Sequence, residues 1–346
     1  MPGKRIAVLG AGANGASIGA DLTRAGEDVV LIEQWPEHVC AMRQHGLTIN
    51  MPGETLKLPV RTMHLCEVAT LRYSFDIILM LVKAYDSRWA AQLVEPYLAR
   101  EGLLVGVQNG MTLDAITDVV GRDRTLGAVI EITSMMFEPG VVERHSPASR
   151  SWFAVGAMDA STAGREEEVG SLLRHAGAVA VVEDIRATKW MKLVSNATTL
   201  VTTAILGLPM VEAAAIPEMR QLMLRSGQEA LDASLGLGNR ALPIFGLTPD
   251  AVSRREHIVE TLLDTLLDGF VMPDSKTTIL QDWMKHRRSE VDDINGLVIA
   301  THATLGSRAP VNEAVVALAH RIERGEAEPG IGNLETLLSR AASMSS

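Results

Sequence analysis

The stretch Arg5-Ile-Ala-Val-Leu-Gly-Ala-Gly-Ala-Asn-Gly15 decides the fold of this 346-residue chain. Its apolar beginning, Arg5–Leu9, predicts a β-strand, and its three glycines have the spacing G-x-G-x-x-G. The apolar spacing over 16–25 then predicts a helix, and Val29–Glu33 predicts a second strand. A strand, a glycine-rich turn, a helix and a second strand in this order form the context of a dinucleotide-binding site.

Each glycine of this stretch has its own expected role. Gly10 permits a tight turn, Gly12 lets the backbone approach a pyrophosphate, and Gly15 lets the helix pack closely on the strand. Ala13 and Asn14 complete the turn, where the free N–H groups and the dipole of a helix N-terminus attract phosphate. The alternative is a glycine-rich turn that binds no ligand.

Glu33 ends the second predicted strand, 23 residues after Gly10. An acidic residue about 20 residues after the glycines binds the adenosine ribose hydroxyls and repels a 2′-phosphate. Gln34, Trp35 and Pro36 follow and supply no Arg or Lys that would pair with such a phosphate. The sequence therefore favours NAD as the cofactor and leaves NADP possible. The alternative is that Glu33 is simply a solvated end of the strand.

The first half of the chain alternates predicted strands and helices, which indicates a mostly parallel sheet. Asp76–Val82 and Leu103–Val107 are apolar runs typical of strands that are buried on both faces. Antiparallel strands are expected over Gly127–Met136 and Val141–Val155, where turn residues interrupt the pattern. We therefore expect an α/β, Rossmann-type domain over residues 1–184.

From about Asp184 onward, the apolar residues recur with helical spacing. The prediction is an all-α domain over residues 185–346, which follows the first without a flexible linker. The expected helices cover 185–205, 211–235, 249–268, 276–305, 311–324 and 333–343.

The composition excludes several classes of protein. The chain has 32 Lys and Arg against 42 Asp and Glu, a formal charge of −10, which argues against nucleic acid or an anionic membrane as the main partner. No apolar run reaches the roughly 18 residues that a membrane helix needs. Cys40 and Cys66 fit neither a metal nor a disulfide pattern, so the prediction is a cytoplasmic protein with reduced thiols and no metal.

Polar side chains follow two of the buried strands. Lys83 comes at the end of the strand 76–82, and Asn109 follows the strand 103–107. Ligands of open α/β sheets bind at the carboxyl ends of the strands, so both residues are expected beside the nicotinamide. A solvated lysine at a strand end is the simpler alternative for Lys83.

The helical half contributes a second group of candidates. Lys192 and Asn196 are four residues apart and share one helix face, which Lys189 could share in part. A lysine and an amide on one face could polarise a carbonyl group. Glu290 lies in a charged segment, with Thr278 twelve residues earlier. The alternatives are an exposed Lys–Asn pair and a solvated charged helix.

These segments, in this order, resemble the ketopantoate reductase (2-dehydropantoate 2-reductase) family over nearly the whole chain. The matching motifs are the G-x-G-x-x-G turn, V-K-A at Lys83, Q-N-G at Asn109, K-L-x-x-N at Lys192, L-Q-D…R-R-x-E-x-D…N-G from Gln281 to Gly296, and P-x-N at Asn312. Each motif is short, and their joint order and spacing make the match specific.

The resemblance implies reduction of a 2-oxo acid to a 2-hydroxy acid with NAD(P)H. It implies that Lys192 is the general acid or base, that Asn196 binds the substrate, and that Glu290 contacts the substrate and supports the site. It also implies that Thr278 holds the substrate carboxylate, and that Lys83 and Asn109 lie at the nicotinamide and the substrate. A helical domain for substrate binding and dimerisation, and hence a homodimer, is the family's pattern.

Two departures from the family's pattern bear on the substrate and the cofactor. Leu200-Val201 stands where the family often has Asn-Pro, which removes a polar group that faces the substrate. Glu33-Gln34 stands where members that use NADPH carry a basic residue. Alternatives to ketopantoate reduction therefore remain: an NAD-dependent dehydrogenase of another hydroxy acid or of an opine-type substrate, and a dinucleotide-binding sensor without catalysis.

Overall fold

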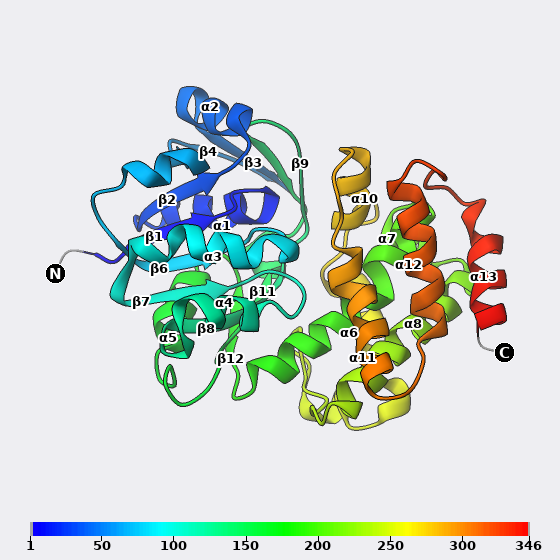
Figure 1. Cartoon of the computed structure of the whole chain (residues 1–346). Coiled ribbons are helices and arrows are strands. Elements are labelled where there is room, and N and C mark those ends of the chain that lie inside the picture. Colours follow the sequence, from blue (N-terminus) through cyan, green and yellow to red (C-terminus); the bar gives the residue numbers. More distant parts are fainter. Residues whose placement is uncertain (1–2, 345–346) are drawn as a thin grey trace. The chain divides into compact units, whose positions relative to one another are not determined.

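The computed structural model describes residues 3–344 and divides into two compact units. The first unit extends to Arg186 and the second begins at Ala187, so the division falls within the first turn of helix α6 (Ile185–Ile205). The sequence places the boundary two residues earlier, between 184 and 185. In Figure 1 the first unit combines strands with helices and the second consists of helices, which confirms the predicted fold class.

The first unit is built on an eight-stranded sheet. Its strands lie in the order β12 (Ala178–Val181), β11 (Trp152–Ala157), β8 (Thr125–Glu131), β7 (Leu98–Gly106), β6 (Phe75–Met80), β1 (Arg5–Leu9), β2 (Asp28–Glu33) and β5 (Arg61–His64). Every neighbouring pair is parallel except β8 with β11. The sheet is therefore mostly parallel, as predicted.

Both faces of this sheet are buried. Ile6 and Val8 belong to a core that also includes side chains of α1 (Ala13–Arg24) and α5 (Glu166–Leu173), while Ala7 and Leu9 are buried on the opposite face. Helices α3 (Ser87–Val94) and α4 (Leu113–Val120) pack against each other, and α4 contacts β7 and β8. Because its faces are covered, ligands can reach the sheet only at the ends of its strands.

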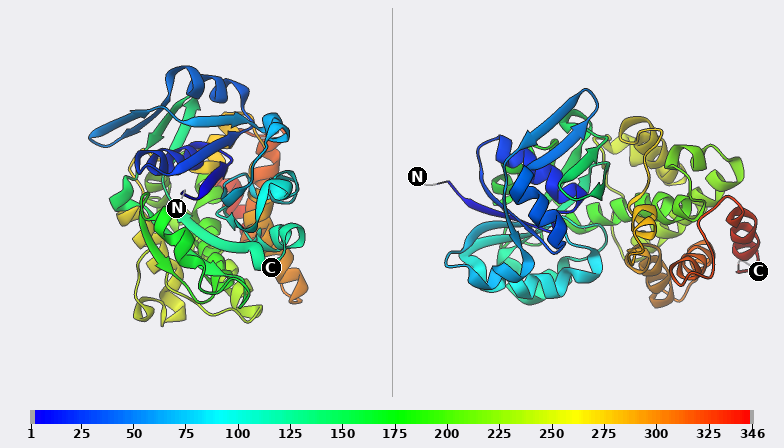
Figure 2. Two further views of the ribbon diagram at one scale, coloured as in Figure 1. Left: turned by 90° about the vertical axis from the view of Figure 1, so that its left-hand side faces the viewer. Right: turned by 90° about the horizontal axis from the view of Figure 1, so that it is seen from above.

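A second sheet of four short strands was not expected from the sequence. Its order is β4 (Glu54–Leu58), β3 (Leu47–Met51), β10 (Val141–Arg144) and β9 (Ser134–Glu138). Helix α1 contacts β3, β9 and β10 as well as the main sheet. Figure 2 shows the β3–β4 hairpin, in blue, extending from the first unit.

A buried ion pair joins α1 to the small sheet. Arg144 and Asp21 are 1% and 2% exposed, and the guanidinium donates a hydrogen bond to the carboxylate. Arg144 also donates to the carbonyl oxygens of Ser146 and Ala176, both at 2.8 Å, and to Ser151 Oγ at 3.2 Å. These partners compensate the cost of burying the Arg144 charge. Removing one partner of such a buried ion pair costs about 3–5 kcal/mol.

His38 connects the glycine turn to the hairpin between β9 and β10. This buried residue of α2 (Pro36–His45) accepts a hydrogen bond at Nδ1 from the Gly140 N–H, at 2.8 Å. Its Nε2 lies 3.1 Å from Ala11 O, to which it donates as the neutral tautomer. Burial lowers the pKa of His38, against the opposing effect of the Ala11 hydrogen bond. The structure thus requires a neutral imidazole here.

The second unit is helical, and three of its predicted helices are corrected. Its helices are α6 (Ile185–Ile205), α7 (Met210–Ala214), α8 (Pro217–Gly236), α9 (Ile258–Gly269), α10 (Thr278–Met284), α11 (Leu297–Thr304), α12 (Pro310–Glu323) and α13 (Asn333–Met344). The predicted helix 211–235 is divided at Ile216, since Pro217 begins α8. The predicted helix 249–268 starts as an α-helix only at Ile258, and 276–305 is interrupted between α10 and Val291.

A buried network of amides fixes the helices of this unit against one another. Asn295 and Asn312 are fully buried, and the Asn295 Nδ2 donates to Asn312 Oδ1 at 2.8 Å and to Ala197 O at 3.3 Å. The Asn312 Nδ2 donates to Ser226 O at 3.1 Å and to Glu229 Oε2 at 2.7 Å. The asparagines of the N-G and P-x-N motifs are therefore structural, joining α6, α8, α12 and the segment before α11.

We predict that Gly15→Ala destabilises the first unit and that Gly12→Ala does not. A Cβ at Gly15 would lie 2.0 Å from Gly10 O, whereas a Cβ at Gly12 would meet no heavy atom within 4 Å. Overpacking of this kind costs about 3 kcal/mol, and loss of the glycine N-cap less than about 1 kcal/mol. Thermal unfolding of both variants checks this, and equal midpoints for the two would contradict it.

The pH dependence of stability should contain a contribution from His38. Since its pKa is lowered in the folded state, the unfolded chain binds the proton more readily, and folding stability falls as the pH drops below about 6.5. The slope from this group is at most about 1.4 kcal/mol per pH unit. His38→Gln keeps a donor and an acceptor without titrating, so its urea unfolding should depend less on pH between 7.5 and 5.5. Parallel curves for the two proteins would refute this role of His38.

Candidate active site

The carboxyl ends of four parallel strands are held in register by backbone hydrogen bonds. The bonds are Gly10 N–H to Ile32 O (2.9 Å), Leu81 N–H to Leu9 O (2.8 Å) and Val107 N–H to Met80 O (3.1 Å). The segments that follow β2, β1, β6 and β7 therefore start at one edge of the sheet. All the candidates predicted for the cofactor lie at the ends of these strands or in the segments that follow them.

The glycine turn has the close contacts that its sequence predicts. Gly10 has a φ of +91°, and a Cβ there would lie 2.7 Å from Val82 N at the end of β6. Gly15 lies against Gly10 O, so the first turn of α1 packs on the turn itself. Both glycines are required by the fold alone, since any side chain would collide with backbone atoms.

Gly12 is different, because the space beside it is open. It is the N-cap of α1, no side chain caps this helix, and its first turn holds no acidic residue. The helix begins at Ala13, three residues earlier than predicted, so Asn14 and Gly15 belong to its first turn. Asn14 Oδ1 accepts a hydrogen bond from Ser134 Oγ at 2.6 Å, which fixes the amide. An uncapped N-terminus beside open space fits a phosphate group.

Glu33 lies at the end of β2, as predicted, and is buried rather than solvated. Its Oε1 accepts hydrogen bonds from the backbone N–H groups of Gln34 and Trp35, at 2.9 and 3.0 Å. His64, on the neighbouring strand β5, has its Nε2 3.0 Å from Gln34 O. The carboxylate therefore shapes the loop that follows β2 and places a negative charge there.

Lys83 and Asn109 follow β6 and β7, and both are half-buried. The two segments are tied together by Gln108, whose Nε2 donates to Ser87 Oγ at 3.1 Å. Ser87 Oγ in turn donates to Ala84 O at 2.7 Å. The backbones of Lys83 and Asn109 therefore lie in two adjacent loops that these hydrogen bonds join.

In the second unit, Lys192 and Asn196 lie on α6, four residues apart and both buried. The Lys192 Nζ lies 5.1 Å from the centroid of the Phe245 ring, within the range of a cation–π interaction. Phe245 is itself buried and packs against Phe270, with ring centroids 5.3 Å apart. No sequence pattern indicated this aromatic neighbour.

Lys189, one turn before Lys192 on α6, is 3% exposed. Burial lowers its pKa to about 7, since desolvation disfavours the charged ammonium. In the sequence analysis Lys189 shares part of the helix face that carries Lys192, and no role is assigned to it. The start of α6 therefore carries two buried lysines.

Thr278 is the first residue of α10, and its hydroxyl oxygen is buried without a hydrogen-bond partner in the described part of the chain. The preceding Thr277 caps the helix, accepting from Leu280 N–H at 3.3 Å and donating to Leu200 O at 3.0 Å. This second bond attaches the start of α10 to α6, one turn beyond Asn196. An unpaired buried hydroxyl is costly, so this oxygen is suited to a ligand.

Glu290 does not lie within a solvated helix. It is 4% exposed and follows the irregular segment after α10. Ser289 anchors that segment, because its N–H and its Oγ both donate to Glu323 Oε1, at 3.0 and 2.6 Å. Five residues later Asn295 bonds to the backbone of α6, so Glu290 lies in a segment held at both ends.

Asp293 is a residue that the sequence analysis did not select. It belongs to a π-helical segment, Asp292–Gly296, and its Oδ2 is buried and unpaired within residues 3–344. Burial raises its pKa, and the negative charge of Glu290 adds to the effect. Single π-helical turns are frequent at functional sites. The spacing of three between Glu290 and Asp293 was the available signal.

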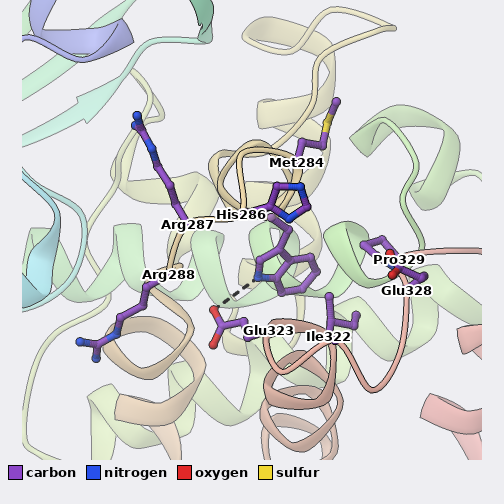
Figure 3. Close-up of a pocket in the computed structure, with 10 residues that line it drawn as sticks. Met284, His286, Arg287, Arg288, Ile322, Glu323, Glu328 and Pro329 are labelled. Atoms are coloured by element: carbon purple, nitrogen blue, oxygen red, sulfur yellow. Dashed lines mark hydrogen bonds between the residues drawn. The ribbon is translucent and has the colours of Figure 1, made fainter. Parts of the chain in front are cut away.

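Figure 3 shows a pocket of the second unit. Its volume is about 490 Å³, and it is lined by residues of α10, of the following loop, of the end of α12 and of the segment after α12. In Figure 3 the side chains of Arg287 and Arg288 extend away from His286 and Ile322. None of the predicted site residues lines this pocket.

The described residues 3–344 hold no group of three or more His, Cys, Asp or Glu side chains arranged for a metal ion. Their helices include none with the length and hydropathy needed to cross a membrane.

Structures of known proteins share this fold. D-mandelate dehydrogenase, solved with NADH and anilino(oxo)acetate, superposes with a TM-score of 0.82 at 20% identity, covering 93% of this chain and 99% of that chain. A ketopantoate reductase from Ralstonia eutropha gives a TM-score of 0.77 at 24% identity with the same coverage.

Sequence comparisons agree. A 2-dehydropantoate 2-reductase of Archaeoglobus fulgidus is 26% identical over 323 residues, 93% of this chain and 99% of that protein. The corresponding protein of Pyrococcus horikoshii is 28% identical over 319 residues, with 91% and 96% coverage. The family model of ketopantoate reductase PanE/ApbA matches residues 6–159, and the model of its C-terminal part matches 184–323. The chain therefore belongs to the ketopantoate reductase family, which consists of NAD(P)-dependent oxidoreductases that act on a CH–OH group.

Proposed function

We propose that the chain transfers hydride between NAD and a small 2-oxo or 2-hydroxy acid, with Lys192 as the general acid or base. The observation that carries the proposal is the arrangement on α6, where Lys192 and Asn196 are buried on one face. The start of α10, with the unpaired Thr278 hydroxyl, is attached to the same helix. A cation, an amide and a hydroxyl are the groups that a 2-oxo acid requires.

The first unit supports the cofactor assignment. Gly12 offers open space at an uncapped helix N-terminus, which suits a pyrophosphate. Glu33 supplies a negative charge where the adenosine ribose is bound in such folds, which favours NAD over NADP. We assign Gly10, Gly12, Ala13, Asn14 and Gly15 to the same cofactor site. The NADH complex of D-mandelate dehydrogenase, a protein of similar fold, agrees with this preference.

The proposed step follows from the charges. With the dinucleotide held at the glycine turn, a reduced nicotinamide would supply the hydride that the carbonyl carbon takes up, and a negative charge would develop on the carbonyl oxygen. The Lys192 ammonium stabilises this charge and donates its proton to the oxygen, which becomes the product hydroxyl. In the oxidative direction, neutral Lys192 accepts the proton from the hydroxyl.

The other polar groups bind and orient the acid. The Asn196 amide binds the substrate, and the Thr278 hydroxyl donates to its carboxylate. Glu290 contacts the substrate and supports the site from its anchored segment. Lys83 and Asn109 act at the nicotinamide and the substrate. Water competes little with the substrate for the Lys192 ammonium, because Lys192 is only 9% exposed.

We further propose a cytoplasmic homodimer in which the first domain binds the dinucleotide and the helical domain binds substrate and the second subunit. Two free, exposed cysteines, Cys40 and Cys66, support a reducing compartment. Dimerisation rests on the family resemblance.

Replacing the general acid should lower turnover and spare cofactor binding. For Lys192→Ala we expect kcat to fall by at least about a hundredfold, as the loss of a general acid typically does, while NADH affinity measured by fluorescence stays unchanged. Lys57→Ala, at an exposed lysine of β4, is the control and should keep full activity. Unchanged turnover of Lys192→Ala would remove the lysine from the mechanism.

The cofactor preference should depend on the charge of Glu33. The wild type should have a higher kcat/KM with NADH than with NADPH. Glu33→Gln keeps the oxygen that accepts from Gln34 and Trp35 and removes the charge, so the preference should shrink by about tenfold, or 1.4 kcal/mol. Steady-state kinetics with both cofactors measure this. A wild type that prefers NADPH would overturn the assignment.

A further inference from the structure

The face of α6 that carries Lys192 and Asn196 continues to Leu200, since each residue is four positions beyond the last. Of residues 187–206, all of which the structure describes, Leu200 alone is partly exposed. Its carbonyl oxygen accepts from Thr277, and Thr277 precedes Thr278. An apolar side chain with free surface thus lies one turn beyond Asn196 and beside the start of α10.

A second apolar group lies at the other end of this face. The Phe245 ring is 5.1 Å from the Lys192 ammonium, and its packing on Phe270 fixes its position. Phe245 also has a φ of +60°. This conformation is strained for a bulky residue and persists only where the surroundings over-determine it. The chain therefore holds an aromatic ring beside the lysine in spite of backbone strain.

We infer that the substrate is a 2-oxo or 2-hydroxy acid whose C2 substituent is apolar and packs against Leu200 and Phe245. This inference rests on the proposed function, because it takes Lys192 as the group that meets the oxygen at C2. A substituent on C2 lies next to that oxygen, and so within reach of the ring that lies 5.1 Å from the Lys192 Nζ. Leu200 continues the face with an alkyl side chain.

The same side chains disfavour a hydroxyl on the substituent. Leu200 offers neither a donor nor an acceptor in its side chain, and burying a hydroxyl without a hydrogen-bond partner is unfavourable. Ketopantoate carries such a hydroxyl on C4, and 3,3-dimethyl-2-oxobutanoate has the same carbon skeleton without it. An apolar pocket rejects an added hydroxyl by up to about a hundredfold. The chain should therefore discriminate between these two acids.

The test compares kcat/KM with NADH for 3,3-dimethyl-2-oxobutanoate and for ketopantoate. We expect the first acid to be favoured by about tenfold to a hundredfold. In Leu200→Asn, the added amide can form a hydrogen bond with the C4 hydroxyl of ketopantoate. The ratio of the kcat/KM values for the two acids should therefore shift toward ketopantoate by at least about tenfold. Thermal unfolding of the variant verifies that it is folded.

A third acid, phenylglyoxylate, tests the aromatic wall. Phe245→Leu should lower kcat/KM for phenylglyoxylate more than for 3,3-dimethyl-2-oxobutanoate, because the loss of ring contact affects the aryl group most. An equal loss for both acids would remove Phe245 from the substrate contact.

The outcomes separate this inference from the proposed function. If the wild type prefers ketopantoate, or if Leu200→Asn leaves the ratio unchanged, the apolar contact is wrong and the hydride transfer stands. If the folded wild type binds NADH and reduces none of the three acids, the proposed function is wrong and the inference falls with it.

Discussion

The contact between Gly15 and the carbonyl oxygen of Gly10 is the constraint on which the first unit depends. Only a residue without a Cβ lets α1 begin so close to the end of β1. That closeness aims the helix N-terminus at the edge where β1, β2, β6 and β7 end, and the same helix then packs between the main sheet and the small one. The buried Asp21–Arg144 pair fixes the far end of α1. The position of the glycine turn at this edge of the sheet thus follows from one close contact between Gly15 and the Gly10 carbonyl oxygen.

In the second unit, buried amides hold the helices in position. α6 is almost entirely buried although it carries a run of threonines, because Thr198, Thr199, Thr202 and Thr203 donate to carbonyl oxygens one turn earlier. The helix therefore satisfies its own hydroxyl groups and leaves the Asn295–Asn312 network to fix it in place. A rigid α6 holds Lys192, Asn196 and Leu200 on one helix face.

Much of the fold was predictable because its signals are local. The G-x-G-x-x-G pattern identified β1, α1 and β2, and the apolar spacing gave the bounds of α6. The small sheet was missed because β3 and β4 are only five residues long each and β4 is largely exposed, so their patterns are weak. The break before Glu290 was missed because its cause is tertiary. The carboxylate of Glu323, on α12, holds Ser289, and His286 adopts a φ of +52°.

The candidate site was likewise predictable only in part. Motif spacing selected elements, and the selected residues lie at a strand end, on a buried helix face or at a helix start, except Glu290, which follows an irregular segment. Phe245 could not be found like this, and Asp293 offered only its spacing of three from Glu290. Phe245 meets Lys192 from a loop more than fifty positions away, and the π-helical turn at Asp293 has no sequence pattern of its own.

The two hydrogen bonds that Glu33 accepts bear on how this enzyme could evolve. One carboxylate both carries the charge after β2 and closes the loop through Gln34 and Trp35. A substitution by a basic residue would change the charge and open the loop in a single step. A mutational route that reverses this charge therefore has to pass through a compensating acceptor, so the loop geometry protects the negative charge after β2.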